Sequence, residues 1–367
     1  MATATYNPRL HALALLTAAA MFPLIFMGGL VTSHGAGMSV PDWPNSYGYN
    51  MFRFPISMWV GGIWYEHIHR LMGTVVGMLG IALTAYAWWS KERAWVRWLA
   101  TSVLGAIIVQ GVLGGLRVVL IRLGLAVIHG CFAQAVFCLA GLMVVVTSRW
   151  WLESPDLSSS SHRSSGRTLI RLATIAVTVI YLQLIVGAFM RHHQAGLAIP
   201  DVPMVFGKWL PPMNATQLEA ANRWRENVPI RRITPGYIDL SLWQPVSMAQ
   251  IWIHFAHRIG AICVTVAVGL LVGYTLIRHR HRGLLVPAVA LIGLLIAQVT
   301  LGVLTVLLQK PADIASTHVA VGALTLLTTF VLLTRASRLY RGHAIGDDDR
   351  AMASLDQPFQ ATGGLVA

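Results

Sequence analysis

Residues 66–70 read Glu-His-Ile-His-Arg, and this polar motif lies near the start of a long apolar stretch. Residues 254–258 read His-Phe-Ala-His-Arg near the start of a second such stretch, and two further stretches contain single histidines, His129 and His318. A charge at mid-membrane costs about 2.5–3.5 kcal/mol on an insertion scale, so ionisable groups in apolar spans usually mark a functional site. The four stretches therefore predict membrane helices whose histidines serve a function.

The composition agrees with a membrane protein. Hydrophobic residues make up 56% of the 367 residues and charged residues only 11%, whereas a soluble domain carries about 25% charged residues. Because backbone groups in lipid must be satisfied internally, apolar stretches long enough to cross the hydrocarbon are expected to be helices. We therefore predict an all-α polytopic membrane protein in contact with the lipid bilayer. The eight predicted spans are 10–33, 62–89, 97–119, 124–148, 169–191, 249–277, 284–308 and 314–335.

The net charge of +13 could suggest a nucleic-acid partner, but the distribution of the basic residues argues against one. With eight spans both termini share one side, and the connections on that side carry most of the arginines. The short loops opposite are poorer, and the long loop 192–248 is a poor guide because long loops translocate largely regardless of charge. This positive-inside bias predicts a multi-pass protein of the cell (inner) membrane, with both termini cytoplasmic and no nucleic-acid partner.

The two halves of the sequence repeat each other. Residues 31–44 align with residues 190–203 at an offset of 159, matching a histidine, an Ala-Gly pair and a Pro-Asp-x-Pro motif. The His-Arg pairs of the two five-residue motifs align at an offset of 188, and His129 aligns with His318 at 189. Each half has four spans, an even number, so the halves should share one orientation. We predict two duplicated four-helix bundles in parallel orientation.

The predicted organisation has four parts. They are an N-terminal half at 1–153, a Ser-rich cytoplasmic linker at 154–168, a C-terminal half at 169–341 and a poorly ordered tail at 342–367. The second outer loop contains an insertion, in which Thr216 and Glu219 form a capping-box pattern that predicts a short helix. All three cysteines fall inside spans, so no external disulfide framework is expected.

Two pairs of imidazoles on facing helices are the arrangement that holds a flat macrocycle, with one ligand from either side of the metal. Pairing His69 with His129, and His257 with His318, keeps each pair within one half. A tetrahedral zinc site would instead need all four histidines to converge, or open coordination with carboxylates. The pattern therefore favours two haem sites at a shared depth in the outer leaflet.

The two predicted sites differ by one carboxylate. Glu66 precedes His69 by three residues and shares its helical face, whereas the second half has His254 at the matching position. Arg70 and Arg258 follow the predicted ligands and could neutralise haem propionates. Two plainer interpretations stay open: Glu66 pairs with Arg70 at i+4, and both arginines extend to the outer interface.

Other polar residues are predicted to have structural roles. His34 and His193 end the first and fifth spans, where they are expected to shape loops. Asp42 and Asp201 are each flanked by prolines and are expected to be turn or cap residues. His67 is expected to contact a neighbouring helix or loop, because it points about 100° away from the preceding residue on the helix.

This pattern resembles the haem A synthase family. The Glu-x-x-His-Arg motif in the second span, its repeat in the sixth and the single histidines of the fourth and eighth spans carry the resemblance. It extends over about residues 10–335. The resemblance implies a membrane oxidoreductase that converts haem O to haem A for terminal oxidases, by oxidising the C8 methyl group of the ring to a formyl group.

The resemblance also implies roles for particular residues. By resemblance, His257 and His318 hold a resident haem b that carries electrons, His69 and His129 receive haem O, and Glu66 is the catalytic carboxylate. One departure concerns the outer loops, where some members have a cysteine pair and this chain has none.

Two alternatives remain from the residues alone. A diheme b-type electron-transfer protein would use the four histidines but not the one-sided carboxylate, and a haem transporter would also suit duplicated halves. Expected partners are haem O, a haem O synthase that delivers it and an electron acceptor that the sequence does not identify. A homo-oligomer is also among the expectations.

Overall fold

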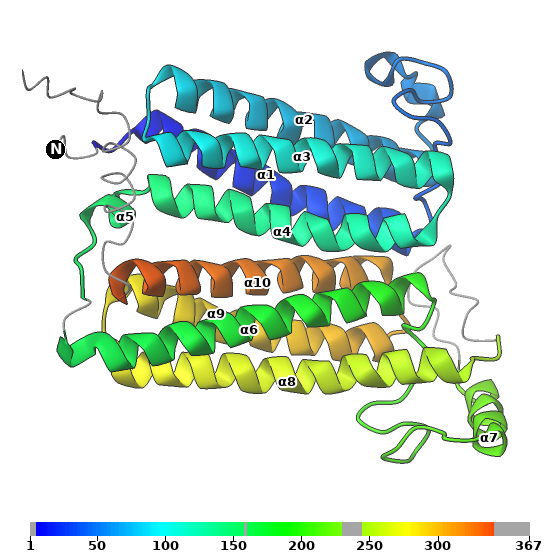
Figure 1. Cartoon of the computed structure of the whole chain (residues 1–367). Coiled ribbons are helices and arrows are strands. Elements are labelled where there is room, and N and C mark those ends of the chain that lie inside the picture. The colour runs from blue at the N-terminus through cyan, green and yellow to red at the C-terminus, as the bar shows by residue number, and fades with distance from the viewer. Residues whose placement is uncertain (1–4, 158–159, 230–243, 341–367) are drawn as a thin grey trace, which may run out of the picture.

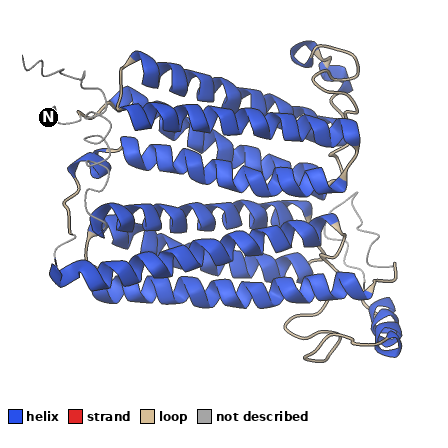
Figure 2. Ribbon diagram, viewed as in Figure 1, coloured by secondary structure: helices blue, strands red, loops and turns tan. Residues whose placement is uncertain are grey.

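The computed structural model describes residues 5–157, 160–229 and 244–340. Within these ranges the regular structure is helical, apart from two isolated β-bridges in loops (Figure 2). The long helices are α1 (Pro8–Ser33), α2 (Gly61–Trp89), α3 (Ala94–Leu120), α4 (Leu123–Thr147), α6 (Ser160–His192), α8 (Met248–Arg278), α9 (Arg282–Leu307) and α10 (Ala312–Tyr340). The shorter elements are α5 (Arg149–Glu153), α7 (Ala215–Glu226) and the 3-10 turns η1 (Met51–Arg53) and η2 (Ile56–Met58).

All eight long helices are long and apolar enough to cross a membrane. They coincide with the eight predicted spans, and most of their ends agree to within about a turn. Large apolar side chains are exposed on outward faces, such as Ile108, Val109 and Val112 on α3. Exposed apolar faces of this kind suit lipid rather than water. The predicted all-α polytopic membrane fold is therefore confirmed.

The long helices lie side by side in two groups. Figure 1 shows α1–α4 packed together above α6 and α8–α10, with the helices roughly parallel or antiparallel. Contacts of α10 with α1 and α4, and of α4 with α6, join the groups. An apolar cluster that includes Met21, Val76, Phe137 and Ala323 crosses this junction. These contacts make α4 and α10 the central helices.

The predicted linker is shorter than expected. Helix α6 begins at Ser160, so it occupies most of the stretch 154–168 that we predicted to be flexible. Ser165 explains part of this difference, because its hydroxyl lies 3.2 Å from Tyr274 Oη and 3.2 Å from His279 Nε2. A Ser-rich composition therefore does not prevent a helix here, since tertiary contacts tie it to α8. The predicted tail 342–367 lies outside the described residues.

The short helix in the insertion is confirmed, but its predicted cap is wrong. Helix α7 begins at Ala215, and its N-cap is Asn214, whose side chain accepts a hydrogen bond from Gln217 N. Asn is as good a cap as Thr, so the helix starts before Thr216. Arg225 donates to the carbonyl of Leu197 and docks α7 on the outer loop. Burial lowers the pKa of Arg225 from its ordinary value.

Candidate functional site

The four predicted iron ligands lie at similar depths near one end of the bundle. His69 is the ninth residue of α2 and His257 the tenth of α8, while His129 and His318 are the seventh residues of α4 and α10. At 1.5 Å per residue, each lies roughly 9–14 Å inside its helix. All four helices begin at the end of the bundle that carries α7, which we call the α7 end (Figure 1).

Each of the four histidine rings packs against a glycine of the preceding long helix. A Cβ atom added at any of these glycines would lie 3.0–3.1 Å from the ring Cε1, so the ring would have to shift. The pairs are Gly28 with His69, Gly114 with His129, Gly187 with His257 and Gly302 with His318. Because glycine lets an imidazole lie directly on a neighbouring backbone, these four contacts fix the position of each ring.

The structure brings together the predicted partners within each half. His69 lies close enough to His129 for the two rings to interact electrostatically, and so does His257 to His318. Among the described residues, no three His, Cys, Asp or Glu side chains form a cluster that could hold a metal ion. In the described part of the chain these interactions join the four histidines as two pairs, one in each half.

The ring nitrogens fit coordination of a haem iron. The Nδ1 atoms of His69, His129 and His318 are buried, and each ring lies beside a backbone carbonyl of the preceding long helix, that of Leu24, Gln110 and Gln298 in turn. A histidine that binds a metal usually donates its other ring N–H to a carbonyl or a carboxylate, so these contacts suit iron ligands. His257 differs, because its Nδ1 lies 3.0 Å from Nε2 of Gln183, which also donates to the His257 carbonyl at 2.8 Å.

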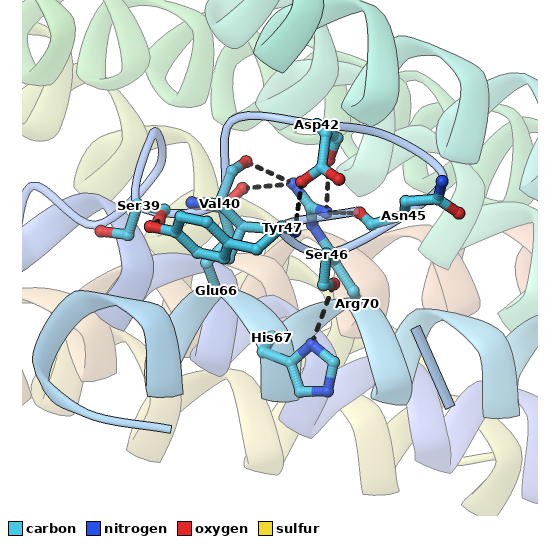
Figure 3. Close-up of polar contacts among 9 residues, drawn as sticks. All are labelled: Ser39, Val40, Asp42, Asn45, Ser46, Tyr47, Glu66, His67 and Arg70. Atoms are coloured by element: carbon cyan, nitrogen blue, oxygen red, sulfur yellow. Dashed lines mark hydrogen bonds and ion pairs between the residues drawn. The ribbon is translucent and has the colours of Figure 1, made fainter. Parts of the chain in front are cut away.

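Arg70 holds the loop that joins α1 to α2. Its Nη1 donates to the carbonyls of Asp42 and Asn45, and its Nη2 donates to the carbonyl of Val40 and to Glu66 Oε1, all at 2.8–2.9 Å (Figure 3). The i+4 pairing of Glu66 with Arg70 is thus present. These contacts organise the loop over the first histidine pair.

Arg258 makes the matching contacts in the second half. Its Nη1 donates to the carbonyl of Met204, and its Nη2 donates to the carbonyls of Ile199 and Asp201. These three acceptors lie 159 residues after those of Arg70, which is the offset of the loop repeat. The structure therefore gives both arginines a loop-holding role. Their predicted contact with propionates stays a prediction.

Glu66 and His254 serve the same backbone position in the two halves. Glu66 Oε2 accepts from Val40 N at 2.9 Å, and His254 Nδ1 accepts from Ile199 N at 3.3 Å. Both side chains are buried, with 4% and 2% of their surface exposed. The two halves thus share one structural bond but place different chemical groups there, a carboxylate in the first half and an imidazole in the second.

The predicted turn and loop residues take those roles. Asp42 accepts from the backbone N–H of Tyr47 (Figure 3) and from that of Gly48. Asp201 accepts from the matching N–H groups of Phe206 and Gly207 in the second loop. Burial alone would raise the pKa of Asp42, but the two backbone donors outweigh it and lower the pKa from its ordinary value. His67 is fully buried, and its Nδ1 lies 3.3 Å from Ser46 Oγ in the loop (Figure 3).

The two histidines that end α1 and α6 also have structural contacts. The Nδ1 of His34 lies 3.0 Å from the carbonyl of Leu30, and the Nδ1 of His193 lies 2.9 Å from the carbonyl of Phe189. His34 stacks on Tyr65 with ring centroids 4.0 Å apart. Both residues therefore terminate their helices, in agreement with the predicted loop role.

Arg117 is a site residue that the sequence motifs do not single out. This side chain of α3 interacts electrostatically with Glu66, His69 and His129. Its guanidinium packs against Gly37 so closely that a Cβ atom there would overlap it. The signal was in the repeat itself, since the residue at the matching offset of 188 in the second half is Thr305.

Together, the fold and the site define a polytopic helical membrane protein with two histidine pairs, one of which has a buried carboxylate beside it. The family model described as cytochrome oxidase assembly protein (COX15-CtaA) matches residues 49–331. This match covers most of the chain, so the protein belongs to that family.

Three curated relatives each match 80% or more of the chain. A heme A synthase of Shewanella oneidensis is 27% identical over 318 residues, covering 83% of this chain and 90% of that protein. A heme A synthase of Rickettsia canadensis is 24% identical and covers 80% of this chain and 88% of that protein. A third relative with the same name, from Rhizorhabdus wittichii, is 24% identical and covers 92% of this chain.

Proposed function

We propose that this protein is a haem A synthase, which oxidises the C8 methyl group of haem O to a formyl group. Family membership over residues 49–331 and three relatives named heme A synthase support this function. The observation that carries it is the asymmetry between Glu66 and His254, which accept the same loop hydrogen bond in the two halves. Only one site has a carboxylate beside a histidine pair.

Haem supplies the redox chemistry that oxidation of an inert methyl group requires, while the protein supplies position and electrostatics. We assign haem O to His69 and His129, and a resident haem b to His257 and His318. The glycine contacts of all four rings and the backbone carbonyls beside three of them support this assignment. A second site without a carboxylate suits electron transfer.

Glu66 is assigned the proton-accepting role. Val40 N and Arg70 each bind one of its carboxylate oxygens, so the orientation of the carboxylate is set by the fold. A carboxylate oxygen has two lone pairs, so each oxygen keeps acceptor capacity for a water or a substrate proton. Its place three residues before His69 puts it on the helical face of that ligand. Glu66 can therefore accept protons released from the methyl group.

The proposal includes a place in the cell. The connections at the end of the bundle opposite the α7 end are rich in arginine. They support an inner-membrane protein with both termini in the cytoplasm. The two histidine pairs then lie in the outer leaflet, near the α7 end. Haem O would reach the first pair from the lipid phase, delivered by a haem O synthase, and electrons would leave through the second pair to an acceptor.

Product analysis tests this function directly. Purified protein in detergent is given haem O and an oxidant, and the haems are extracted and identified by mass spectrometry. A haem A synthase yields the formyl product. Recovery of unchanged haem O from protein that has both histidine pairs loaded would contradict the enzyme and support a diheme electron carrier or a haem transporter instead.

A further inference from the structure

We propose that Arg117 binds a propionate carboxylate of haem O and fixes the rotation of the ring in the first site. The inference rests on the proposed function, because it needs the first histidine pair to receive haem O. It assigns Arg117 a positioning role in that site, which neither the sequence motifs nor Arg70 supplies.

Arg117 lies on the face of α3 that meets the first histidine pair. On the same helix, Gly114 lies three residues earlier and packs against the His129 ring. Gln110 lies seven residues earlier, and its Nε2 donates to the His129 carbonyl at 2.8 Å. Residues three and four apart share a helical face. The loop closes the other side, because Gly37 packs against the guanidinium. The guanidinium of Arg117 therefore lies between α3, the loop that joins α1 to α2, and the His129 ring.

The donors of Arg117 are available for a ligand. No hydrogen bond joins its guanidinium to any of the described residues, and the side chain is half-buried. In contrast, Arg70 gives both of its Nη atoms to loop carbonyls and Glu66, and Arg258 does the same with its own loop. Of these three arginines, Arg117 is the one whose donor fork can accept a carboxylate by two parallel bonds.

The second half is built differently at this position. Thr305 replaces Arg117, and its hydroxyl donates to the carbonyl of Leu301 within its own helix. The glycine that matches Gly37 is Gly196, where an added Cβ atom would lie 3.7 Å from the aliphatic Cδ of Lys310. Lysine is a point charge, whereas arginine presents a planar fork that sets the orientation of a carboxylate. The orienting group is therefore specific to the half that holds Glu66.

The chemistry of the substrate explains why such a group is needed. Two axial imidazoles fix the plane of a haem but not its rotation about the axis through the iron. Only one methyl group of the ring is oxidised, and the C8 methyl is the ring neighbour of a propionate. A clamp on that propionate places the C8 methyl near Arg117, and Arg117 is close enough to Glu66 to interact with it electrostatically. The contact between Arg117 and the propionate thus selects the ring methyl group that lies near the carboxylate of Glu66.

The test compares haem O with its dimethyl ester, in which both carboxylates lose their charge. Full-length Arg117→Gln, Arg117→Lys and wild-type protein are titrated with each compound and followed by absorption, and the resident haem signal reports folding. Arg122→Gln is the control, since Arg122 is an exposed arginine at the same end. Wild-type and Arg122→Gln protein are expected to bind the acid roughly 10- to 100-fold more tightly than the ester.

In Arg117→Gln this preference should fall to about one-tenth of its wild-type value or less, with affinity for the ester unchanged, and Arg117→Lys should restore part of it. Arg117→Gln protein should also oxidise a mixture of ring methyl groups. A full preference in Arg117→Gln would overturn the proposal and point to Arg70. Equal weakening of acid and ester would also overturn it and show that Arg117 only supports the loop. Failure of wild-type protein to form haem A would reject the proposed function separately.

Discussion

At the scale of single residues, Glu66 and His254 make the same loop hydrogen bond in the two halves but differ in the chemistry of their side chains. Each side chain accepts a hydrogen bond from the matching loop amide, Val40 or Ile199, so both halves keep their loop in place. A carboxylate can also accept a proton from water or substrate, and Glu66 is held in one orientation by two donors. The loop contact therefore does not argue against a catalytic role for Glu66.

Changing Glu66 to Gln tests the catalytic role of its carboxylate. The Gln carbonyl can still accept from Val40 N, but the amide cannot accept a proton, so haem A formation is expected to fall by roughly 100-fold or more. The resident haem should be retained, because Glu66 belongs to the other half. Product and resident haem are measured on the same preparation.

The matched control is His254→Gln, which alters the same loop bond in the second half. It should leave haem A formation at the first site far less affected than Glu66→Gln. If both variants lose product and resident haem equally, the shared role is structural, and the catalytic assignment of Glu66 fails.

At the scale of elements, the glycine contacts decide how the helices hold the histidine rings. In Gly302→Ala, the new Cβ would lie 3.1 Å from His318 Cε1, so the ring must shift. We expect a lower content of the resident low-spin haem, read from the absorption spectrum. Helix stability should not fall, because Ala has a higher helix propensity than Gly by about 1 kcal/mol.

Gly293→Ala is the matched control on the same helix, because nothing lies within 4 Å of a Cβ atom there. This variant should keep the full spectrum. An unchanged spectrum in Gly302→Ala would show that the His318 ring does not depend on its glycine contact, and the steric account would be wrong.

The elements also show what the sequence can and cannot predict. Span positions follow from local hydropathy, which is why α2 and α8 begin within a residue of their predicted starts. The start of α6 was wrong because Ser165 makes tertiary contacts that composition does not report. The same limit applies to Arg70, whose loop acceptors lie 25 to 30 residues away in the chain.

At the scale of the whole molecule, topology places both histidine pairs on one side of the membrane. Tags at either terminus are expected to be cytoplasmic, and α7 is expected to be cleaved by protease added from outside. The physical reason is the excess of arginine in the connections at the end of the bundle opposite the α7 end. Cleavage of α7 only from the cytoplasmic side would reverse the orientation and move both sites to the inner leaflet.

The repeat allowed the four histidines and Glu66 to be predicted, because they align between the halves or break that alignment at one position. Arg117 also breaks the alignment, because Thr305 lies at the matching position, but that difference alone does not show what the side chain contacts. Its importance depends on the loop at Gly37 and on the His129 ring, which meet it only after α3, α4 and the loop have packed together. Residues that differ between the halves are therefore as informative as residues that match.

The central claim is that the two halves are specialised, with a resident haem at His257 and His318 and the substrate at His69 and His129. The most direct measurement is the absorption spectrum of purified single-histidine variants, each changed to Ala. Loss of the low-spin b-type signal is expected for the His257 and His318 variants, with the signal retained in the His69 and His129 variants. A signal that survives both second-half substitutions, or that disappears with His69 alone, would contradict the account.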